Sequence, residues 1–396
     1  MISVDDAVHR ITSAFSVLDS ESVPLKEAAG RVLSNDVLAR QSQPPTPVSS
    51  MDGYAVRASD ALKPGARLVV AGKAPAGHPF AGSLGGGQAI RIFTGAVVPE
   101  GADAIVIQED SAIDGDEVVL NVPAIRGRHI RAAGLDFESG EVIVRSGRRL
   151  TPRDVALIAA GDVPDVLVRR RPNIAFAATG DELSLPGAPR KPGGIVASSG
   201  FGLASMIEKW GGIAIDLGIL PDTHEAVASI ADHCKSADLV VTIGGASVGE
   251  HDLVQKALGP KGFELDFWKI AMRPGKPLIF GRLGRTPLLG LPGNPVSTLV
   301  CALLFLRPAI SAMLGTQQNA NVMTARLATE LQPNDGRQDY VRARTQVRDG
   351  ELWVEALPIQ DSSMLSALAA ADVLITRPPR AAAARIGDQV SVLSLD

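Results

Sequence analysis

The sequence predicts a multidomain protein of mixed α/β and β class, with a central doubly wound, mostly parallel α/β domain. With a prior of about 150 residues per domain, its 396 residues suggest two to four domains. Strand and helix patterns alternate over 172–315, which is typical of an open parallel sheet with helices on both faces. Before and after that segment, at 48–131 and 316–396, short strands and turns predict a β-rich insert domain and a small C-terminal β barrel.

The N-terminal linking domain is expected to be discontinuous, formed by residues 1–47 and 132–171 on either side of the insert. Apolar residues spaced by three and four after Ser3 predict a helix at the start of the chain. Thr151, followed by proline at the first helical position, predicts a second helix that Gly161 ends.

The insert and the C-terminal segment share a pattern of short β-type runs separated by turn residues. The expected strands lie at 66–70, 89–93, 104–107 and 117–120 in the insert, and at 338–344 and 351–356 in the C-terminal segment.

The α/β segment is expected to place its functional residues at one edge, because ligands of such sheets bind outside the carboxyl ends of the strands. The expected strands are Asn173–Ala178, Ile213–Leu220, Asp238–Ile243, Phe263–Ile270, Pro277–Phe280 and Pro287–Leu291. The expected helices are Gly200–Trp210, Thr223–Ser236, Asp252–Leu258 and Pro295–Leu314.

Composition excludes several classes of protein. With 45% hydrophobic and 21% charged residues, the chain is neither disordered nor collagen-like. A net charge of −4 and only 4% aromatic residues argue against nucleic-acid binding. Two cysteines, Cys234 and Cys301, cannot form a disulfide framework. No signal peptide is recognisable, and the longest apolar run, Leu299–Leu306, is far shorter than the ~20 residues of a membrane span, so we expect a cytoplasmic protein without a membrane partner.

Three turns at strand ends could bind an anion. The first, Gly-rich turn contains Gly244, Gly245, Ser247 and Gly249, and such a turn before a helix either binds phosphate or simply needs glycine to turn tightly. A second, proline-stiffened turn carries Lys269, Arg273 and Lys276, which suit an oxyanion unless the loop is only solvated. The third turn contains Pro292, Gly293, Asn294 and Pro295, and ordinary helix-start chemistry explains most of it.

Acidic residues follow several of the same strands. Glu182, Asp222 and Asp252 beside a phosphate-binding turn suggest a divalent ion that bridges carboxylate and phosphate oxygens, although helix capping is the alternative. In the insert, Asp52 and Thr94 lie in turns that are ordinary hairpin material by themselves.

Taken together and in this order, seven motifs resemble the MoeA family of molybdopterin molybdenumtransferases, which is similar to the E domain of gephyrin. The motifs are Met51–Val56, Thr94–Gly95 with Pro99–Asp103, Arg131–Asp136, Thr179–Leu183, Gly244–Glu250, Pro274–Pro277 and Leu291–Pro295. The resemblance spans nearly the whole chain. Two positions depart from the family pattern: Arg273 stands where lysine is usual, and the helix entry Ile195–Gly200 lacks the Asp/Asn-Ser-Asn pattern expected there, a departure that falls at Ala197–Gly200.

The resemblance implies a four-domain homodimer with an active site shared across the interface. It implies an enzyme that takes adenylylated molybdopterin and molybdate, with Mg2+, inserts molybdenum at the dithiolene and releases AMP. Other molybdenum cofactor biosynthesis proteins are implied as partners.

Site residues are carried over by motif position. The implied catalytic residues are Asp52, Thr94, Asp136, Glu182, Asp222, Asp252, Lys269, Arg273 and Lys276. The implied cofactor-binding residues are Gly244, Gly245, Ser247, Gly249, Pro292, Gly293, Asn294, Pro295, Arg342 and Ser363. The implied metal ligands are Glu182, Asp222 and Asp252.

Two rival interpretations remain open at this point. The same fold could serve as a non-catalytic or specialised molybdopterin-binding scaffold. Alternatively, only the α/β domain could be shared, as in a nicotinamide-nucleotide amidase with a CinA-like domain, although the β insert and the β-rich C-terminal segment argue against this.

Overall fold

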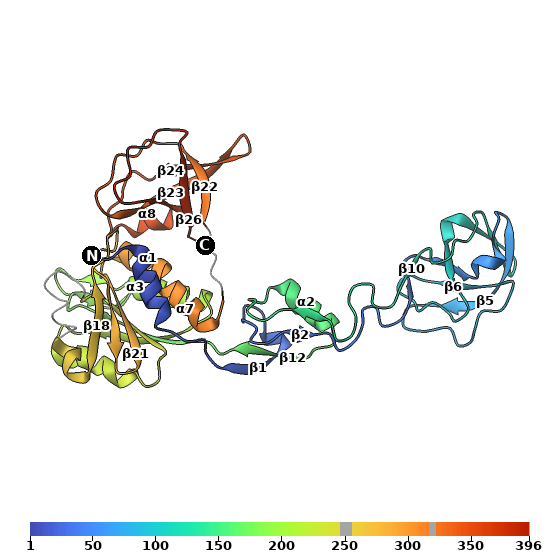
Figure 1. Ribbon diagram of the computed structural model, residues 1–396, viewed down its shortest axis with the longest axis horizontal. Helices are drawn as coiled ribbons and strands as arrows, with labels where there is room; N and C mark the ends of the chain where they lie inside the picture. The colour runs from blue at the N-terminus through green and yellow to red at the C-terminus, as the bar shows by residue number, and fades with distance from the viewer. Residues whose placement is uncertain (246–255, 317–321, 396) are drawn as a thin grey trace. The chain divides into compact units, whose positions relative to one another are not determined.

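The computed structural model describes residues 1–245, 256–316 and 322–395. The chain folds as two compact units (Figure 1). The first unit comprises Met1–Glu21, Gly30–Val32 and the chain from Arg169 onward, and the second comprises Ser22–Ala29 and Leu33–Val168.

The first unit is built on a six-stranded sheet of order β16-β13-β17-β21-β20-β18. Its strands are β13 (Asn173–Thr179), β16 (Ile213–Leu220), β17 (Leu239–Ile243), β18 (Phe263–Trp268), β20 (Ile279–Leu283) and β21 (Thr286–Leu291). The four strands β16, β13, β17 and β21 run parallel. β20 pairs antiparallel with β21 and β18 pairs antiparallel with β20, so within this sheet β20 runs against the other strands. The predicted mostly parallel sheet is therefore confirmed.

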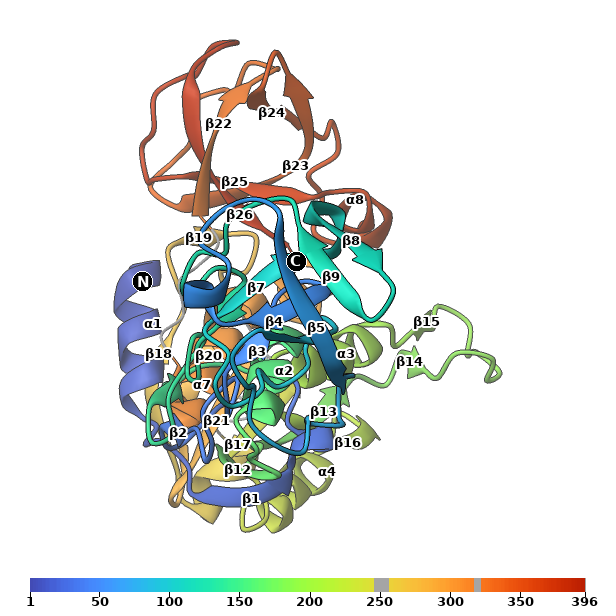
Figure 2. The same cartoon turned by 90° about the vertical axis from the view of Figure 1, so that its right-hand side faces the viewer.

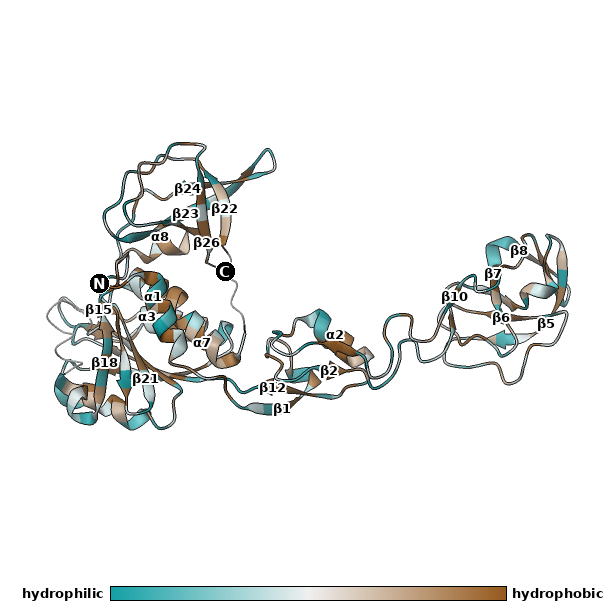
Figure 3. Ribbon diagram, in the orientation of Figure 1, coloured by the Kyte–Doolittle hydropathy of each residue, from teal (hydrophilic) through white to brown (hydrophobic). Residues whose placement is uncertain are grey.

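Helical segments cover both faces of this sheet. They are α1 (Val4–Ser13), α3 (Ser199–Lys209), α4 (His224–Ala228), η4 (Ser229–His233), η5 (Gly259–Lys261), α6 (Pro295–Cys301), the π-helical turn η6 (Ala302–Leu306) and α7 (Arg307–Leu314). Side chains alternate between the faces, as a strand requires. Phe176 and Val241 join the core beneath α6 and α7, whereas Ala175 and Val240 pack against α4 and η4. Figure 3 shows the ribbon of this unit coloured by hydropathy.

Two predicted helices differ in detail from the observed ones. Thr223–Ser236 begins as the α-helix α4 but continues as the tighter helix η4. Pro295–Leu314 is helical throughout, but a π-helical turn precedes Pro308. Proline has no N–H to donate to the preceding turn, and the wider π turn accommodates that loss. The beginning of the predicted helix Asp252–Leu258 lies outside the described residues.

The same helical stretch, Pro295–Leu314, is the one described helix long and apolar enough to cross a membrane. Most of it is buried in the core of the first unit, where Val300, Phe305 and Ile310 are fully covered. Its hydropathy is that of a core helix of a globular α/β domain.

The helix α1 is capped by Ser3 as predicted, since the Ser3 hydroxyl accepts the Asp6 N–H at 3.1 Å. Its placement differs from the expected grouping with 132–171. Val4, Ala7 and Ile11 are buried in the core of the α/β sheet, so α1 belongs to the first unit.

The C-terminal segment closes into the predicted small β barrel (Figure 2). Its strands are β22 (Val322–Leu327), β23 (Gln338–Arg348), β24 (Glu351–Ala356), β25 (Val373–Arg377) and β26 (Gln389–Ser394), with the helix α8 (Leu365–Ala369). Strand β23 pairs with both β24 and β25, which closes the ring. The short strand β19 (Met272–Arg273) pairs with β23 and ties the barrel to the α/β domain.

The second unit contains the predicted β insert, a sheet of order β7-β4-β6-β5-β9-β8. Its strands are β4 (Gly53–Val56), β5 (Ala66–Ala74), β6 (Gln88–Ile92), β7 (Ala104–Ile107), β8 (Ser111–Asp114) and β9 (Glu117–Leu120), and η2 (Ala58–Asp60) and η3 (Gln108–Asp110) are short 3-10 turns.

Strands before and after the insert pair in nested order, β1 with β12, β2 with β11 and β3 with β10. These elements are β1 (Ser20–Pro24), η1 (Leu25–Glu27), β2 (Val37–Leu38), β3 (Val48–Ser49), β10 (Ile130–Arg131), β11 (Val142–Val144), α2 (Pro152–Ala160) and β12 (Asp165–Arg169). The helix α2 starts with the predicted Thr151 cap, completed by Asp154 as a capping box. The nesting fits a discontinuous domain, and the division into four domains stays a prediction.

Candidate functional site at the strand ends

Four parallel strands end at one edge of the central sheet, and their turns are hydrogen-bonded to one another. The Gly180 N–H, after β13, donates to the carbonyl of Leu220, the last residue of β16, at 3.2 Å. The Gly244 N–H, after β17, donates to the carbonyl of Leu291, the last residue of β21, at 3.0 Å. The three predicted sequence motifs that begin at these strand ends are thus brought together.

Gly244 is required by space as well as by backbone conformation. Its φ is +93°, and a Cβ there would lie 2.8 Å from the Thr179 carbonyl oxygen. The Gly293 backbone also approaches closely, since a Cβ on Gly293 would lie 3.5 Å from the Gly244 Cα. Gly245 follows with φ +67°. Consecutive residues in this conformation turn the chain without covering the surface with side chains.

Three acidic residues crowd the ends of β13 and β16. The Asp222 N–H donates to Asp181 Oδ1 at 3.3 Å. The Glu182 carboxylate folds back over Gly180, where a Cβ would lie 2.7 Å from Glu182 Oε2. Burial, and then the negative charges of Asp181 and Glu182, raise the pKa of Asp222. A cation at this edge would relieve that repulsion.

The described residues contain no group of three or more His, Cys, Asp or Glu side chains arranged to hold a metal ion. Asp252, the third predicted metal ligand, lies outside the described residues, as do Ser247 and Gly249. The donor chemistry of Glu182 and Asp222 fits Mg2+, which prefers oxygen ligands. The metal site therefore stays a prediction.

The third turn, at Pro292–Pro295, is covered by a loop of the C-terminal barrel. Asn294 precedes α6 without capping it, and its Nδ2 instead donates to Ser362 Oγ at 2.9 Å. The Val296 N–H, in the first turn of α6, donates to the Ser362 carbonyl at 3.1 Å. Ser362 thus brings the neighbouring Ser363 to the same edge of the sheet as the glycine turns.

The loop that carries Ser363 is held by Arg342. The Arg342 side chain is fully buried, and its Nη2 donates to the carbonyls of Ile359 and Asp361 at 3.3 and 3.2 Å. Within the described chain its Nε and Nη1 are buried without a partner. Burial lowers the pKa of Arg342. The hydroxyl and the N–H of Ser363 donate to Asp361, and these bonds lower the pKa of that carboxyl.

The predicted cations differ in how free they are. Lys269 places its Nζ 3.5 Å from the centre of the Trp268 ring, a cation–π contact that directs the side chain. The Arg273 guanidinium binds Asp339 through two bonds, Nε to Oδ1 at 3.1 Å and Nη2 to Oδ2 at 2.6 Å. Lys276 is exposed. Arg273 is therefore already neutralised by a carboxylate of the barrel.

The remaining predicted residues lie in the second unit. Asp52 Oδ1 accepts both the N–H and the hydroxyl of Thr94 at 2.8 Å. These two bonds, together with the charge of Arg91, lower the pKa of Asp52. Two residues that were predicted from separate motifs thus form one hydrogen-bonded pair. Asp136 is exposed, and its N–H donates to the Gln43 carbonyl at 2.9 Å.

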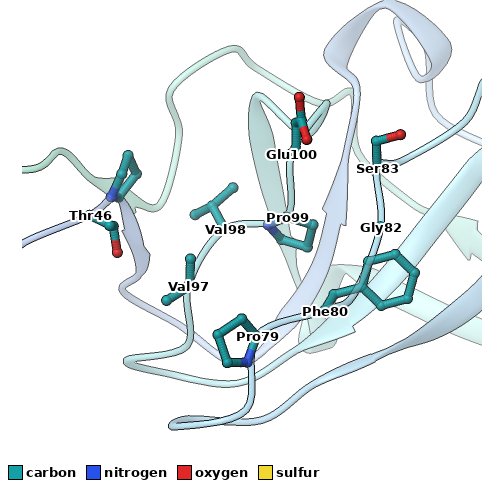
Figure 4. A pocket seen from close by; sticks show the side chains of 10 residues that line it. Thr46, Pro79, Phe80, Gly82, Ser83, Val97, Val98, Pro99 and Glu100 are labelled. Carbon is teal, nitrogen blue, oxygen red and sulfur yellow. The ribbon is translucent and has the colours of Figure 1, made fainter.

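A cavity of about 650 Å³ lies in the insert (Figure 4). The residues that line it are Thr46, Pro47, Pro79, Phe80, Gly82, Ser83, Val97, Val98, Pro99 and Glu100. None of these is a predicted site residue. The hydrogen-bonded turns at the strand ends, rather than cavity size, mark the candidate site.

Sequence reasoning missed Asp339 and Ser362. Asp339 pairs with a residue 66 positions earlier, and no local pattern signals such a pairing. Ser362 adjoins the predicted Ser363, but only the fold shows that it contacts Asn294.

Three family models match the chain: "MoeA N-terminal region (domain I and II)" over residues 2–161, "Probable molybdopterin binding domain" over 175–312 and "MoeA C-terminal region (domain IV)" over 324–395. The turns at the strand ends lie in the second of these. Fold and site together define a multidomain protein built around an α/β domain of the molybdopterin-binding class.

Full-length relatives narrow this class to one family. The chain is 34% identical to the molybdopterin molybdenumtransferase of Haemophilus influenzae, across 99% of this chain and 98% of the relative. It is 35% identical to molybdopterin molybdenumtransferase 2 of Mycobacterium tuberculosis, across 94% and 95%. The crystal structure of the molybdopterin biosynthesis MoeA protein from Pyrococcus horikoshii superposes with a TM-score of 0.86 over the whole of both chains, at 27% identity. The chain belongs to the MoeA family.

Proposed function

We propose that this protein is a molybdopterin molybdenumtransferase of molybdenum cofactor biosynthesis. It takes adenylylated molybdopterin and molybdate, inserts molybdenum at the dithiolene and releases AMP. One observation carries the proposal: several groups lie together at one edge of the sheet. They are the turns at Gly180 and Gly244, the acids Glu182 and Asp222, and the barrel loop with Ser363. Full-length similarity to transferases disfavours the non-catalytic scaffold.

Both substrates are anionic, so we assign a role to each residue from the hydrogen bonds and the positive charge that it can offer to an anion. The glycine turn that begins at Gly244–Gly245 offers a surface without side chains to the nucleotide phosphates. Lys269 and Lys276 supply positive charge to the phosphates and to molybdate. Arg273, whose guanidinium is bound to Asp339, holds the basic turn against the barrel.

Arg342 and Ser363 form the barrel's part of the proposed site. The two buried donors of Arg342 that have no partner in the described chain suit an oxyanion. Ser363, whose hydroxyl and N–H donate to Asp361, orients the loop beside Arg342. This assignment makes the barrel a binding element for the inorganic substrate.

Mg2+ is the proposed cofactor, held by Glu182 and Asp222 with Asp252. When bound, it would polarise the phosphoanhydride that is cleaved. The carboxylates themselves would repel the phosphates, so they can approach the substrate only with a cation between them.

We propose a cytoplasmic homodimer in which Asp52, Thr94 and Asp136 complete the site of a partner subunit. The Asp52–Thr94 pair keeps that carboxylate ionised and oriented, as a substrate-contacting residue requires. Light scattering at micromolar concentration tests the dimer, and a monomeric mass would contradict it.

The activity is tested with purified protein, adenylylated molybdopterin, molybdate and Mg2+. We expect release of AMP together with molybdenum-containing cofactor. Substrate that remains adenylylated would contradict the proposed function.

A further inference from the structure

The fold does not explain why the hydroxyl of Thr179, at the carboxyl end of β13, is buried. Thr179 is the last residue of β13 and is only 7% exposed. Its Oγ1 is buried and has no hydrogen-bond partner in the part of the chain that the structure describes. A buried hydroxyl without a partner costs stability, so it calls for a reason.

The position of this hydroxyl points to the glycine turn. A Cβ on Gly244 would lie 3.0 Å from Thr179 Oγ1, which means that the Thr179 side chain lies directly against Gly244. Gly244 carries no side chain to engage the hydroxyl, and Gly245 continues the turn with φ +67°. The Thr179 hydroxyl thus lies directly against the first residue of the glycine turn.

The neighbouring groups are negative, which restricts what can bind there. Glu182 folds over Gly180, the residue after Thr179, and Asp222 follows the adjacent strand. Carboxylates accept hydrogen bonds but cannot donate them to an anion. Among the residues that the structure describes next to Gly244, the Thr179 hydroxyl is a neutral side-chain donor that an anionic group could use.

We propose that Thr179 is a further substrate-binding residue, whose hydroxyl donates to a phosphate oxygen of the adenylylated substrate seated over Gly244–Gly245. This inference rests on the proposed function and names one additional contact within it. The missing partner of the hydroxyl is then the substrate, and the cost of the unpaired group in the free protein is recovered on binding.

The chain supplies a matched control in Thr242. Its Oγ1 is also buried without a partner in the described chain, and Thr242 is fully covered. Thr242 lies inside β17, in register with Ala177 and Gly290, two residues or about 7 Å before Gly244. Thr242 therefore has the same kind of buried, unpaired hydroxyl, but it does not lie against the glycine turn.

The test compares Thr179→Val, Thr179→Ser and Thr242→Val in the full chain. Affinity for adenylylated molybdopterin is measured by calorimetry without molybdate, and Tm is measured without ligand. Valine preserves shape and removes the orphan hydroxyl, so we expect an equal or higher Tm in both valine variants. Only Thr179→Val should bind substrate more weakly, by roughly tenfold or more, and Thr179→Ser should bind nearly as well as the wild type.

Several results would overturn the inference. Unchanged affinity in Thr179→Val would show that the hydroxyl does not touch substrate, and so would equal losses in Thr179→Val and Thr242→Val. A lower Tm with normal affinity would assign the hydroxyl a structural role. If valine at 179 prevents folding, Thr179→Ala gives the same comparison. A wild-type protein that does not bind the substrate would instead refute the proposed function itself.

Discussion

Replacing Gly244 by alanine tests whether the strand-end turns interlock as tightly as the structure indicates. The change adds one methyl group at φ +93°, placed 2.8 Å from the Thr179 carbonyl oxygen and 3.0 Å from its hydroxyl. Left-handed backbone costs an L-residue about 1–2 kcal/mol. Forcing a methyl against fixed backbone adds about 1–3 kcal/mol. We therefore expect Gly244→Ala to lower the free energy of unfolding by about 2–5 kcal/mol.

Gly262 separates these two contributions. Its φ is +90°, nearly the same as that of Gly244, but a Cβ there would meet nothing within 4 Å. Gly262→Ala should therefore show the conformational cost alone, about 1–2 kcal/mol. The difference between the two variants measures the close approach to Thr179.

Urea unfolding of both variants gives the two free energies, and titration with adenylylated molybdopterin gives their affinities. We expect Gly244→Ala to be the less stable variant and the only one with weakened substrate binding. Equal losses of stability would show that the turn has room to relax. Normal binding by a folded Gly244→Ala protein would refute the placement of substrate over this turn.

Three further predictions concern the charged residues. Lys276→Ala should weaken substrate binding by about 1.5–3 kcal/mol, measured by calorimetry, and unchanged affinity would make the basic turn a merely solvated loop. Asp339→Asn should lower the free energy of unfolding by roughly 1–2 kcal/mol, because it removes the charge that Arg273 binds through two hydrogen bonds, and an unaltered urea midpoint would contradict this. Burial and neighbouring acids raise the pKa of Asp222 in the folded protein. Ionised Asp222 therefore destabilises the fold at pH values above this raised pKa, and the destabilisation disappears below the ordinary pKa of 3.8, where the carboxyl is protonated in both states. Without Mg2+, Asp222→Asn should therefore raise Tm at pH 7 and leave Tm at pH 3 unchanged. Added Mg2+ should no longer stabilise this variant. A lower Tm at pH 7 would refute the mutual repulsion of the acids.

Local chemistry explains why much of the fold could be predicted from the sequence. Continuous apolar runs mark β13 and β17, which are buried on both faces of the sheet, and the Thr151 cap with its following proline marks the start of α2. The rule that ligands bind at the carboxyl ends of parallel strands also predicts that Glu182 and Gly244 lie at the same edge of the sheet.

Other features depend on residues far apart in the chain, and the sequence alone could not predict them. The partner of Arg273 is Asp339, and the contact of Asn294 is Ser362, each more than 60 positions away. The placement of α1 depends on which core buries Ile11, and its own amphipathic pattern fits either domain. Where contacts between distant residues determine the structure, the local sequence pattern does not predict it.

The measurement that tests the central claim most directly is a single-turnover reaction of the purified protein with adenylylated molybdopterin and molybdate, with and without Mg2+. We predict AMP and molybdenum-loaded cofactor in equal amounts when all components are present, and neither product at a comparable rate when Mg2+ is removed. AMP release without molybdenum insertion would indicate a hydrolase. Binding of the substrate without any AMP release under complete conditions would contradict the account and leave the protein a molybdopterin-binding scaffold.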